Sequence, residues 1–216
     1  SRLRSIPGSR EDTAEAALAA ADDPTQPFYA SHNWHPMFVE GIKTVGFEIW
    51  EQLGFRAPDA IVAPAGNGSM ILGLYEAFRA LQSGDEIDRL PRIIAVQAEA
   101  CAPLAHAFEI GADDVSPFEK QPTMAEGIAS ARPIRARQVL AAIRASGGAA
   151  IAVPESNLLP SVKQLARRGF FVEPTSAVVA AALPALLRRS ILKSGERTVL
   201  LLSGSGLKAT EKLLSA

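Results

Sequence analysis

The sequence lacks the features that mark membrane proteins and nucleic-acid-binding proteins. Its apolar runs are far shorter than the roughly 20 residues that a helix needs to cross a bilayer. Lysine and arginine number 22 against 23 acidic residues, and no basic run exceeds two residues. A formal net charge of −1 without a basic cluster gives no electrostatic reason to bind phosphate backbones or anionic lipids. We therefore expect neither nucleic acid nor a membrane among its partners.

Cysteine and histidine are nearly absent as well. Cys101 is the single cysteine, which excludes an internal disulfide and suits a reducing compartment, so we expect a cytoplasmic protein. His32 and His35 stand too close together and lack a third ligand at helix spacing, so no metal site is expected. His106 lies near Cys101, and the pattern favours a surface histidine beside a buried cysteine over a catalytic pair.

The common nucleotide motifs and nucleophile motifs are missing too. Glycines at 66, 68 and 73 do not have the G-x-G-x-x-G spacing of dinucleotide-binding loops, and no Walker loop is present. The "SGSG" at 203–206 lacks the flanking spacing of a nucleophile elbow, and Ser205 has no evident base.

What the chain does have is an alternation of apolar blocks and helical patterns. Helices are predicted after residue 9 and at 38–53 (with Gly54 as a left-handed end), 69–82, 134–146, 156–168 and 176–189, the last interrupted by Pro184. Strands are predicted at 60–64, 92–99, 149–153 and 197–203. Such unalternating apolar strands indicate an α/β fold: a mostly parallel sheet with helices on both faces, in three layers.

The loop "PAGNGSM" joins the first of these strands to a helix. Gly66 and Gly68 would let the backbone approach an anion, and the N–H groups of residues 66–70 could converge on phosphate oxygens. The last strand ends in Ser203, whose hydroxyl would reach the same crevice. A tight turn without a ligand would need the same glycines, so the loop alone leaves both interpretations open. Glu126 and Glu173 are both interpreted as acids at helix starts.

Six segments stand in an order that resembles fold-type II pyridoxal-phosphate enzymes, most closely threonine synthase and its relatives. They are "NWHPMFVEGIKTVGFEIWEQLG", "PAGNGSM", "VQAE", "TMAEGIA", "FVEPTSA" and "LSGSGLK". The resemblance implies the C-terminal half of the large domain of a tryptophan-synthase-β-like fold. Residues 1–25 would then end the small domain, and residues 26–216 would belong to the large cofactor-binding domain.

The resemblance also implies roles for particular residues towards pyridoxal 5'-phosphate. Backbone amides of Gly66, Asn67, Gly68, Ser69 and Met70 would hold the cofactor phosphate, although the family loop usually ends in Gly-Asn. Ser203 would hydrogen-bond the pyridine nitrogen, where threonine synthases tend to carry Thr; a neutral hydroxyl does not hold that nitrogen protonated. Gly127 and Glu173 would lie near the cofactor.

One family element has no counterpart in these 216 residues. The Schiff-base lysine belongs to a motif upstream of the glycine loop, and none of the six lysines stands in that context: Lys43, Lys120, Lys163, Lys193, Lys208 and Lys212. The opening "SRLRSIPGSR" also has no Met and resembles a strand already under way. We therefore expect a fragment without a catalytic residue of its own, from an enzyme that converts O-phosphohomoserine to threonine and phosphate.

Three alternatives stay open at this point. Ser205 replaces the His of the usual "GHGLK" of threonine synthases, and "TMAEGIA" is shared with serine and threonine dehydratases, which act by β-elimination. Outside that cofactor class, the chain could be a non-catalytic α/β domain that binds another phosphorylated ligand, or a domain without an anion. An amino-acid substrate and a homodimer are the remaining expectations.

Overall fold

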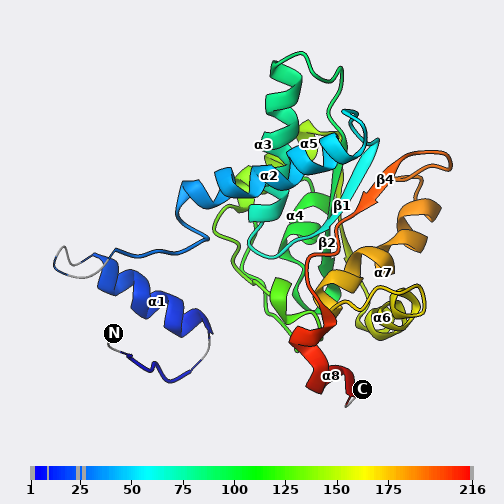
Figure 1. The fold of residues 1–216 in the computed structure, drawn as a ribbon. Coiled ribbons are helices and arrows are strands. Elements are labelled where there is room, and N and C mark those ends of the chain that lie inside the picture. Colours follow the sequence, from blue (N-terminus) through cyan, green and yellow to red (C-terminus); the bar gives the residue numbers. More distant parts are fainter. Residues whose placement is uncertain (1–2, 9, 23–24, 26–27, 215–216) are drawn as a thin grey trace.

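The computed structural model describes residues 3–8, 10–22, 25 and 28–214, and its core is a parallel β-sheet (Figure 1). The strands are β1 (Ala60–Pro64), β2 (Arg92–Ala98), β3 (Ala149–Val153) and β4 (Thr198–Leu200). They lie in the order β3-β2-β1-β4, and every neighbouring pair is parallel. All four strands therefore start at one edge of the sheet and end at the other, as the predicted α/β class requires.

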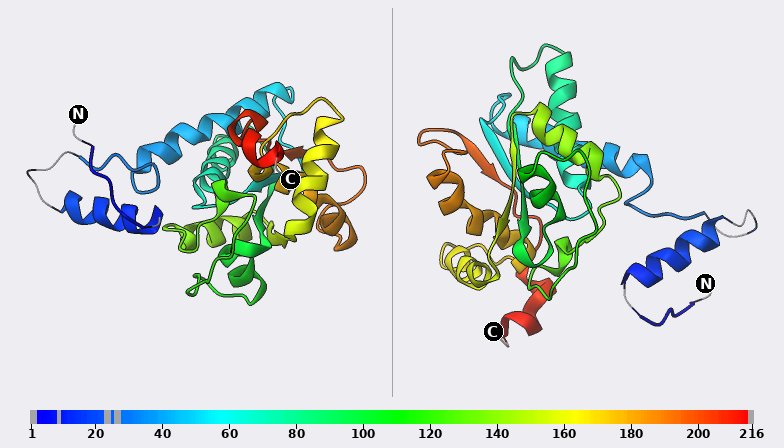
Figure 2. Two further views of the ribbon diagram at one scale, coloured as in Figure 1. Left: turned by 90° about the horizontal axis from the view of Figure 1, so that it is seen from below. Right: turned by 180° about the vertical axis from the view of Figure 1, so that it is seen from behind.

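Helices cover both faces of the sheet, and side chains from successive strand positions pack on opposite faces (Figures 1 and 2). On one face, Ile61, Ile93 and Ala150 pack among α2 (Pro36–Gln52), α3 (Ser69–Ser83), α4 (Pro103–Glu109) and α5 (Ala136–Ala145). On the other, Val62 and Ile94 pack against α6 (Leu158–Ala166) and α7 (Pro174–Arg188). This is the predicted three-layer arrangement, and burial on both faces explains why the strand sequences do not alternate.

The boundaries of most elements agree with the sequence, and two predictions were wrong. α7 runs without a break through Pro184, although the sequence predicted an interruption there, and it begins two residues before the predicted start at 176. Neighbouring residues of the helix, Ala181, Ala182 and Leu186, are buried against the sheet, and this packing outweighs the hydrogen bond that proline cannot donate. β4 ends at Leu200, so residues 201–203 leave the sheet earlier than predicted.

The first helix lies apart from the rest of the chain in every view. α1 (Arg10–Ala21) is separated from the sheet and its helices in Figures 1 and 2, and α2 begins only at Pro36. Parts of the predicted 1–25 segment lie outside the described residues. The assignment of that segment to another domain stays a prediction.

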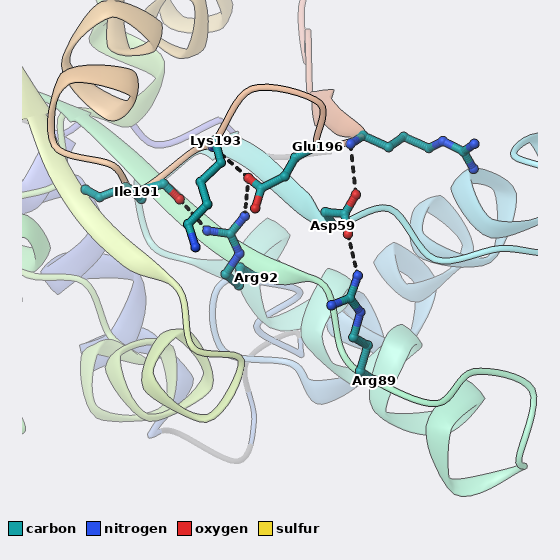
Figure 3. A network of polar contacts seen from close by, with 7 residues as sticks. Asp59, Arg89, Arg92, Ile191, Lys193 and Glu196 are labelled. Carbon is teal, nitrogen blue, oxygen red and sulfur yellow. Dashed lines mark hydrogen bonds and ion pairs between the residues drawn. The ribbon is translucent and has the colours of Figure 1, made fainter.

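A polar network ties the strands together at the edge where they begin (Figure 3). The Asp59 carboxylate accepts hydrogen bonds from the side chain of Arg89 at 2.5 Å and from the backbone N–H of Arg197 at 2.9 Å. The Arg92 guanidinium donates to the Ile191 carbonyl and to the Glu196 carboxylate. This network lies at the opposite edge from the predicted site residues, so its role is to fix the ends of β1, β2 and β4.

Candidate functional site

The loop between β1 and α3 is held in a conformation that only glycine allows. Gly68 has φ +89° and ψ 1° directly before α3, in the left-handed region. A Cβ there would collide with the Val139 side chain from α5, and a Cβ on Gly66 would lie 3.1 Å from Ile128 Cα. Gly73, by contrast, is explained by helix packing, since a Cβ there would run into Ile42 of α2. The two loop glycines therefore serve close backbone approaches at the carboxyl end of β1.

Polar hydrogens at the start of α3 lack partners. The first hydrogen bond of the helix runs from the Leu72 N–H to the Gly68 carbonyl at 3.0 Å, so the N–H groups of residues 69–71 have no helical carbonyl to donate to. The Ser69 hydroxyl is buried and has no hydrogen-bond partner among the described residues. Together with the dipole of a 15-residue helix, these donors form a site that favours an anion.

The "TMAEGIA" segment packs directly on the glycine loop. Asn67 Oδ1 accepts a hydrogen bond from the Ser130 hydroxyl at 2.9 Å, and the Gly127 carbonyl lies against Gly66. The Gly127 N–H in turn donates to Thr175 Oγ1 of α7 at 3.1 Å. The structure thus brings Gly127 to the loop, as expected, and connects both to the first turn of α7.

Ser203 lies at the same edge, just beyond the end of the neighbouring strand β4. Its hydroxyl is 3.2 Å from Ser176 Oγ in α7, and its side chain is exposed. Because Val62 of β1 pairs with Leu200 of β4, the chains that continue from these strands leave the sheet side by side. The Leu201 N–H still donates to the Val62 carbonyl at 2.9 Å. Ser203 and the glycine loop therefore flank one crevice at the carboxyl edge, where α/β sheets bind ligands.

The two acids predicted at helix starts are found there, and each pairs with a lysine from the C-terminal segment. Glu173 is the N-cap residue of α7, and its Oε1 is 3.4 Å from Lys208 Nζ. The Glu173 side chain lies over Gly204, where a Cβ would collide with it. Glu126 opens a 3-10 turn (Glu126–Ile128) and pairs with Lys212. Glu173 thus borders the residue next to Ser203, and Glu126 lies next to Gly127.

Gln97 belongs to the "VQAE" segment, but no sequence pattern singled it out as a support of the site. Its side chain is fully buried at the carboxyl end of β2 and donates to the Ala65 carbonyl at 3.0 Å. Its Oε1 accepts from the N–H groups of Leu104 and Ala105 at 2.8 and 3.1 Å. Gln97 therefore fixes the residue that enters the glycine loop and caps α4 at the same time. A polar residue within an otherwise apolar strand was the available signal.

Other candidates do not gather at this edge. Lys43 lies within α2 and pairs with Glu40 at 3.0 Å. A surface hollow of about 520 Å³ is lined by Asn33, Trp34, Asp114, Ile134, Arg135, Arg137 and Gln138, and the predicted cofactor residues lie outside that lining. The described residues contain no group of three or more His, Cys, Asp or Glu side chains placed to hold a metal ion. Within the same residues, no helix is both long and apolar enough to span a membrane.

Comparison with known proteins places this geometry in a family. The family described as "Pyridoxal-phosphate dependent enzyme" matches residues 1–204. Threonine synthase of Methanocaldococcus jannaschii is 36% identical over 189 residues, which cover 87% of this chain and 47% of that protein. Threonine synthase of Methanosarcina acetivorans is 35% identical over 214 residues, which cover 99% and 52%. The chain therefore spans about half the length of these curated relatives.

Solved structures of related enzymes have the same fold. A threonine deaminase from the source abbreviated T.th. superposes with a TM-score of 0.62 at 28% identity, over 80% of this chain and 59% of that one. An L-serine ammonia-lyase from Rhizomucor miehei gives a TM-score of 0.74 at 21% identity, over 94% and 64%. The second likeness supports the fold alone.

Proposed function

Because the chain belongs to the family of pyridoxal-phosphate-dependent enzymes, we propose that it forms the cofactor-holding part of a threonine-synthase-like enzyme. The observation that carries this proposal is the set of unpaired donors at the start of α3. Three backbone N–H groups and the Ser69 hydroxyl lack partners at a loop where a Cβ on Gly68 would not fit. Phosphate oxygens would satisfy those donors, so the residues present fit the phosphate of pyridoxal 5'-phosphate.

In this proposal, Gly66–Met70 bind the cofactor phosphate, and Ser203 hydrogen-bonds the pyridine nitrogen. The bound cofactor supplies an electron sink for carbanions formed on an amino-acid substrate. The chain's own contribution is placement: Gln97 and Ser130 fix the glycine loop, while Thr175 fixes Gly127 against it. Since Ser203 is uncharged, it does not stabilise a protonated ring nitrogen as a carboxylate would.

The substrate proposed for the intact enzyme is O-phosphohomoserine, converted to threonine and phosphate by β,γ-replacement. The support comes from relatives described as threonine synthases that match nearly all of this chain. The test is an assay of the intact protein for phosphate released from O-phosphohomoserine, with 2-oxo acid released from threonine measured in parallel. Phosphate release without 2-oxo acid is expected, and the reverse pattern would overturn the substrate assignment.

The second candidate is a β-eliminating dehydratase. It is supported by the likeness to a threonine deaminase, which extends over 80% of the chain at 28% identity. In the same assay this candidate requires 2-oxo acid from threonine or serine. If neither product forms and the protein binds other phosphorylated ligands instead, a non-catalytic binding domain replaces both candidates.

Residues 1–216 by themselves are proposed to be inactive, because the lysine that the family resemblance requires is not among their six lysines. Lys208 is the sharpest challenge, since it lies beside Glu173 near Ser203. Borohydride reduction of this chain with pyridoxal 5'-phosphate, followed by peptide mapping, tests the proposal. Specific fixation on Lys208 or on another of the six would contradict it.

The cytoplasmic location and the homodimer remain part of the proposal. Neither a nucleic acid nor a membrane is included among the partners. Sedimentation of the intact protein at several concentrations tests the dimer: a monomer at all of them would remove it.

A further inference from the structure

Ser176 is a fully buried hydroxyl that neither the sequence motifs nor the proposed function assigns to a task. It stands in the first turn of α7 and has no solvent exposure. Its Oγ accepts a hydrogen bond from the Gly204 N–H at 2.7 Å. It also lies 3.2 Å from two acceptors, the Gly204 carbonyl and the Ser203 hydroxyl. Ser176 is therefore in direct contact with the residue proposed to meet the pyridine nitrogen.

The number of donors and acceptors limits how these groups can pair. The Ser176 hydroxyl has one proton, and the Gly204 N–H already occupies one of its acceptor positions. The Gly204 carbonyl receives a hydrogen bond from the Glu173 N–H at 3.1 Å, so it is satisfied without Ser176. The Ser203 oxygen has no such second donor among the described hydrogen bonds. The arrangement that pairs the most groups has the Ser176 proton on the Ser203 oxygen.

From this geometry we infer that Ser176 is a positioning residue that makes Ser203 a hydrogen-bond donor to the cofactor ring. When Ser203 accepts from Ser176, its own proton is free to point into the crevice. A pyridine nitrogen with a lone pair can accept that proton, whereas a protonated nitrogen would need an acceptor instead. Ser176 thereby favours the unprotonated ring. The inference rests on the proposed function, because it concerns the same cofactor.

The test is Ser176→Ala in the intact protein, loaded with pyridoxal 5'-phosphate that carries nitrogen-15 in the ring. Without Ser176, the Ser203 oxygen can accept a hydrogen bond from a protonated ring. The ring nitrogen signal is therefore expected to move towards its protonated position, and its titration midpoint to rise. Cofactor affinity should fall about fivefold, the size of one neutral hydrogen bond. An unchanged nitrogen-15 titration in the loaded variant would overturn the inference.

Ser146→Ala is the matched control. Ser146 is also a buried serine that accepts from a backbone N–H, that of Ile93 at 3.1 Å, and donates to a carbonyl, that of Ile143 at 2.8 Å. It lies beside the start of β2, at the opposite edge of the sheet. Its removal should lower stability without moving the nitrogen-15 titration. An equal movement in both variants would mean that the effect is general, and it would also overturn the inference.

A measurement without cofactor separates this inference from the proposed function. Amide hydrogen exchange of cofactor-free protein should show Gly204 protected in the wild type and faster in Ser176→Ala, because its 2.7 Å acceptor is gone. Unchanged exchange would contradict the geometry itself, whatever the ligand. Faster exchange together with no cofactor binding by the wild type would refute the proposed function, and the ring-directed role of Ser176 with it.

Discussion

Replacing Gly68 with alanine should be much more damaging than an ordinary loop substitution. The backbone at Gly68 has φ +89°, and the left-handed region costs a residue with a Cβ about 1–2 kcal/mol. The new methyl group would also meet Val139, whose own exposed fraction is 0%. Overpacking of that kind costs about 1–3 kcal/mol. Gly68→Ala should therefore lower the free energy of unfolding by about 2–5 kcal/mol.

The chain offers a control that isolates the steric part. Gly54 also has a positive φ, +71°, but a Cβ there would meet nothing within 4 Å. Gly54→Ala should therefore cost only about 1 kcal/mol, the backbone part alone. Combining Gly68→Ala with Val139→Ala should be less destabilising than the sum of the two single changes, because the second removes the obstacle to the first.

Urea unfolding followed by circular dichroism measures all four variants against the wild type. The m-value should stay constant, so that shifts in midpoint report stability. The reasoning would be refuted if Gly68→Ala and Gly54→Ala cost the same, or if the double variant were simply additive. Either result would mean that Val139 does not press against the loop and that Gly68 is there for its backbone angle only.

Two further predictions concern polar groups on either edge of the sheet. Gln97→Leu leaves the Ala65 carbonyl unpaired along with two N–H groups of α4, and should cost about 2–5 kcal/mol of unfolding free energy in urea; a loss under about 0.5 kcal/mol would contradict it. Hydrogen bonds from the Lys193 N–H and then from Arg92 lower the pKa of Glu196 in the folded chain, so its stabilisation is complete above the ordinary value of 4.5 and is lost as the pH falls through the folded pKa. Glu196→Gln should therefore make stability less sensitive to acid between pH 7 and pH 3, and parallel urea midpoints for both proteins would count against this.

The strands and most helices could be predicted because their signals are local. The blocks at 60–64 and 149–153 are apolar throughout and bounded by loop residues, so their limits match the structure. Pro184 misled the prediction because its local effect on a helix is known, whereas the buried neighbours that keep α7 continuous are not visible in a pattern. β4 was predicted too long for a related reason: residues 201–203 stay apolar or small after pairing with β1 has ended.

The candidate site was predictable in outline but not in its supports. Glycine spacing and the segment order indicated Gly66–Met70 and Ser203, and the structure places both at the carboxyl edge. Ser176 and Gln97 could not be assigned tasks in this way, because their partners lie 27 and 32 positions away in sequence. A serine at the start of an apolar helix and a glutamine in an apolar strand are noticeable, yet only the fold shows what they hold.

The central claim is that Gly66–Met70 and Ser203 hold one pyridoxal 5'-phosphate between them. A crystal structure of the intact protein grown with that cofactor tests it most directly. The account predicts the phosphate within hydrogen-bond distance of the N–H groups at the start of α3 and of the Ser69 hydroxyl, with the ring nitrogen on Ser203. A cofactor whose phosphate lies elsewhere, or whose ring nitrogen meets another residue, would contradict it.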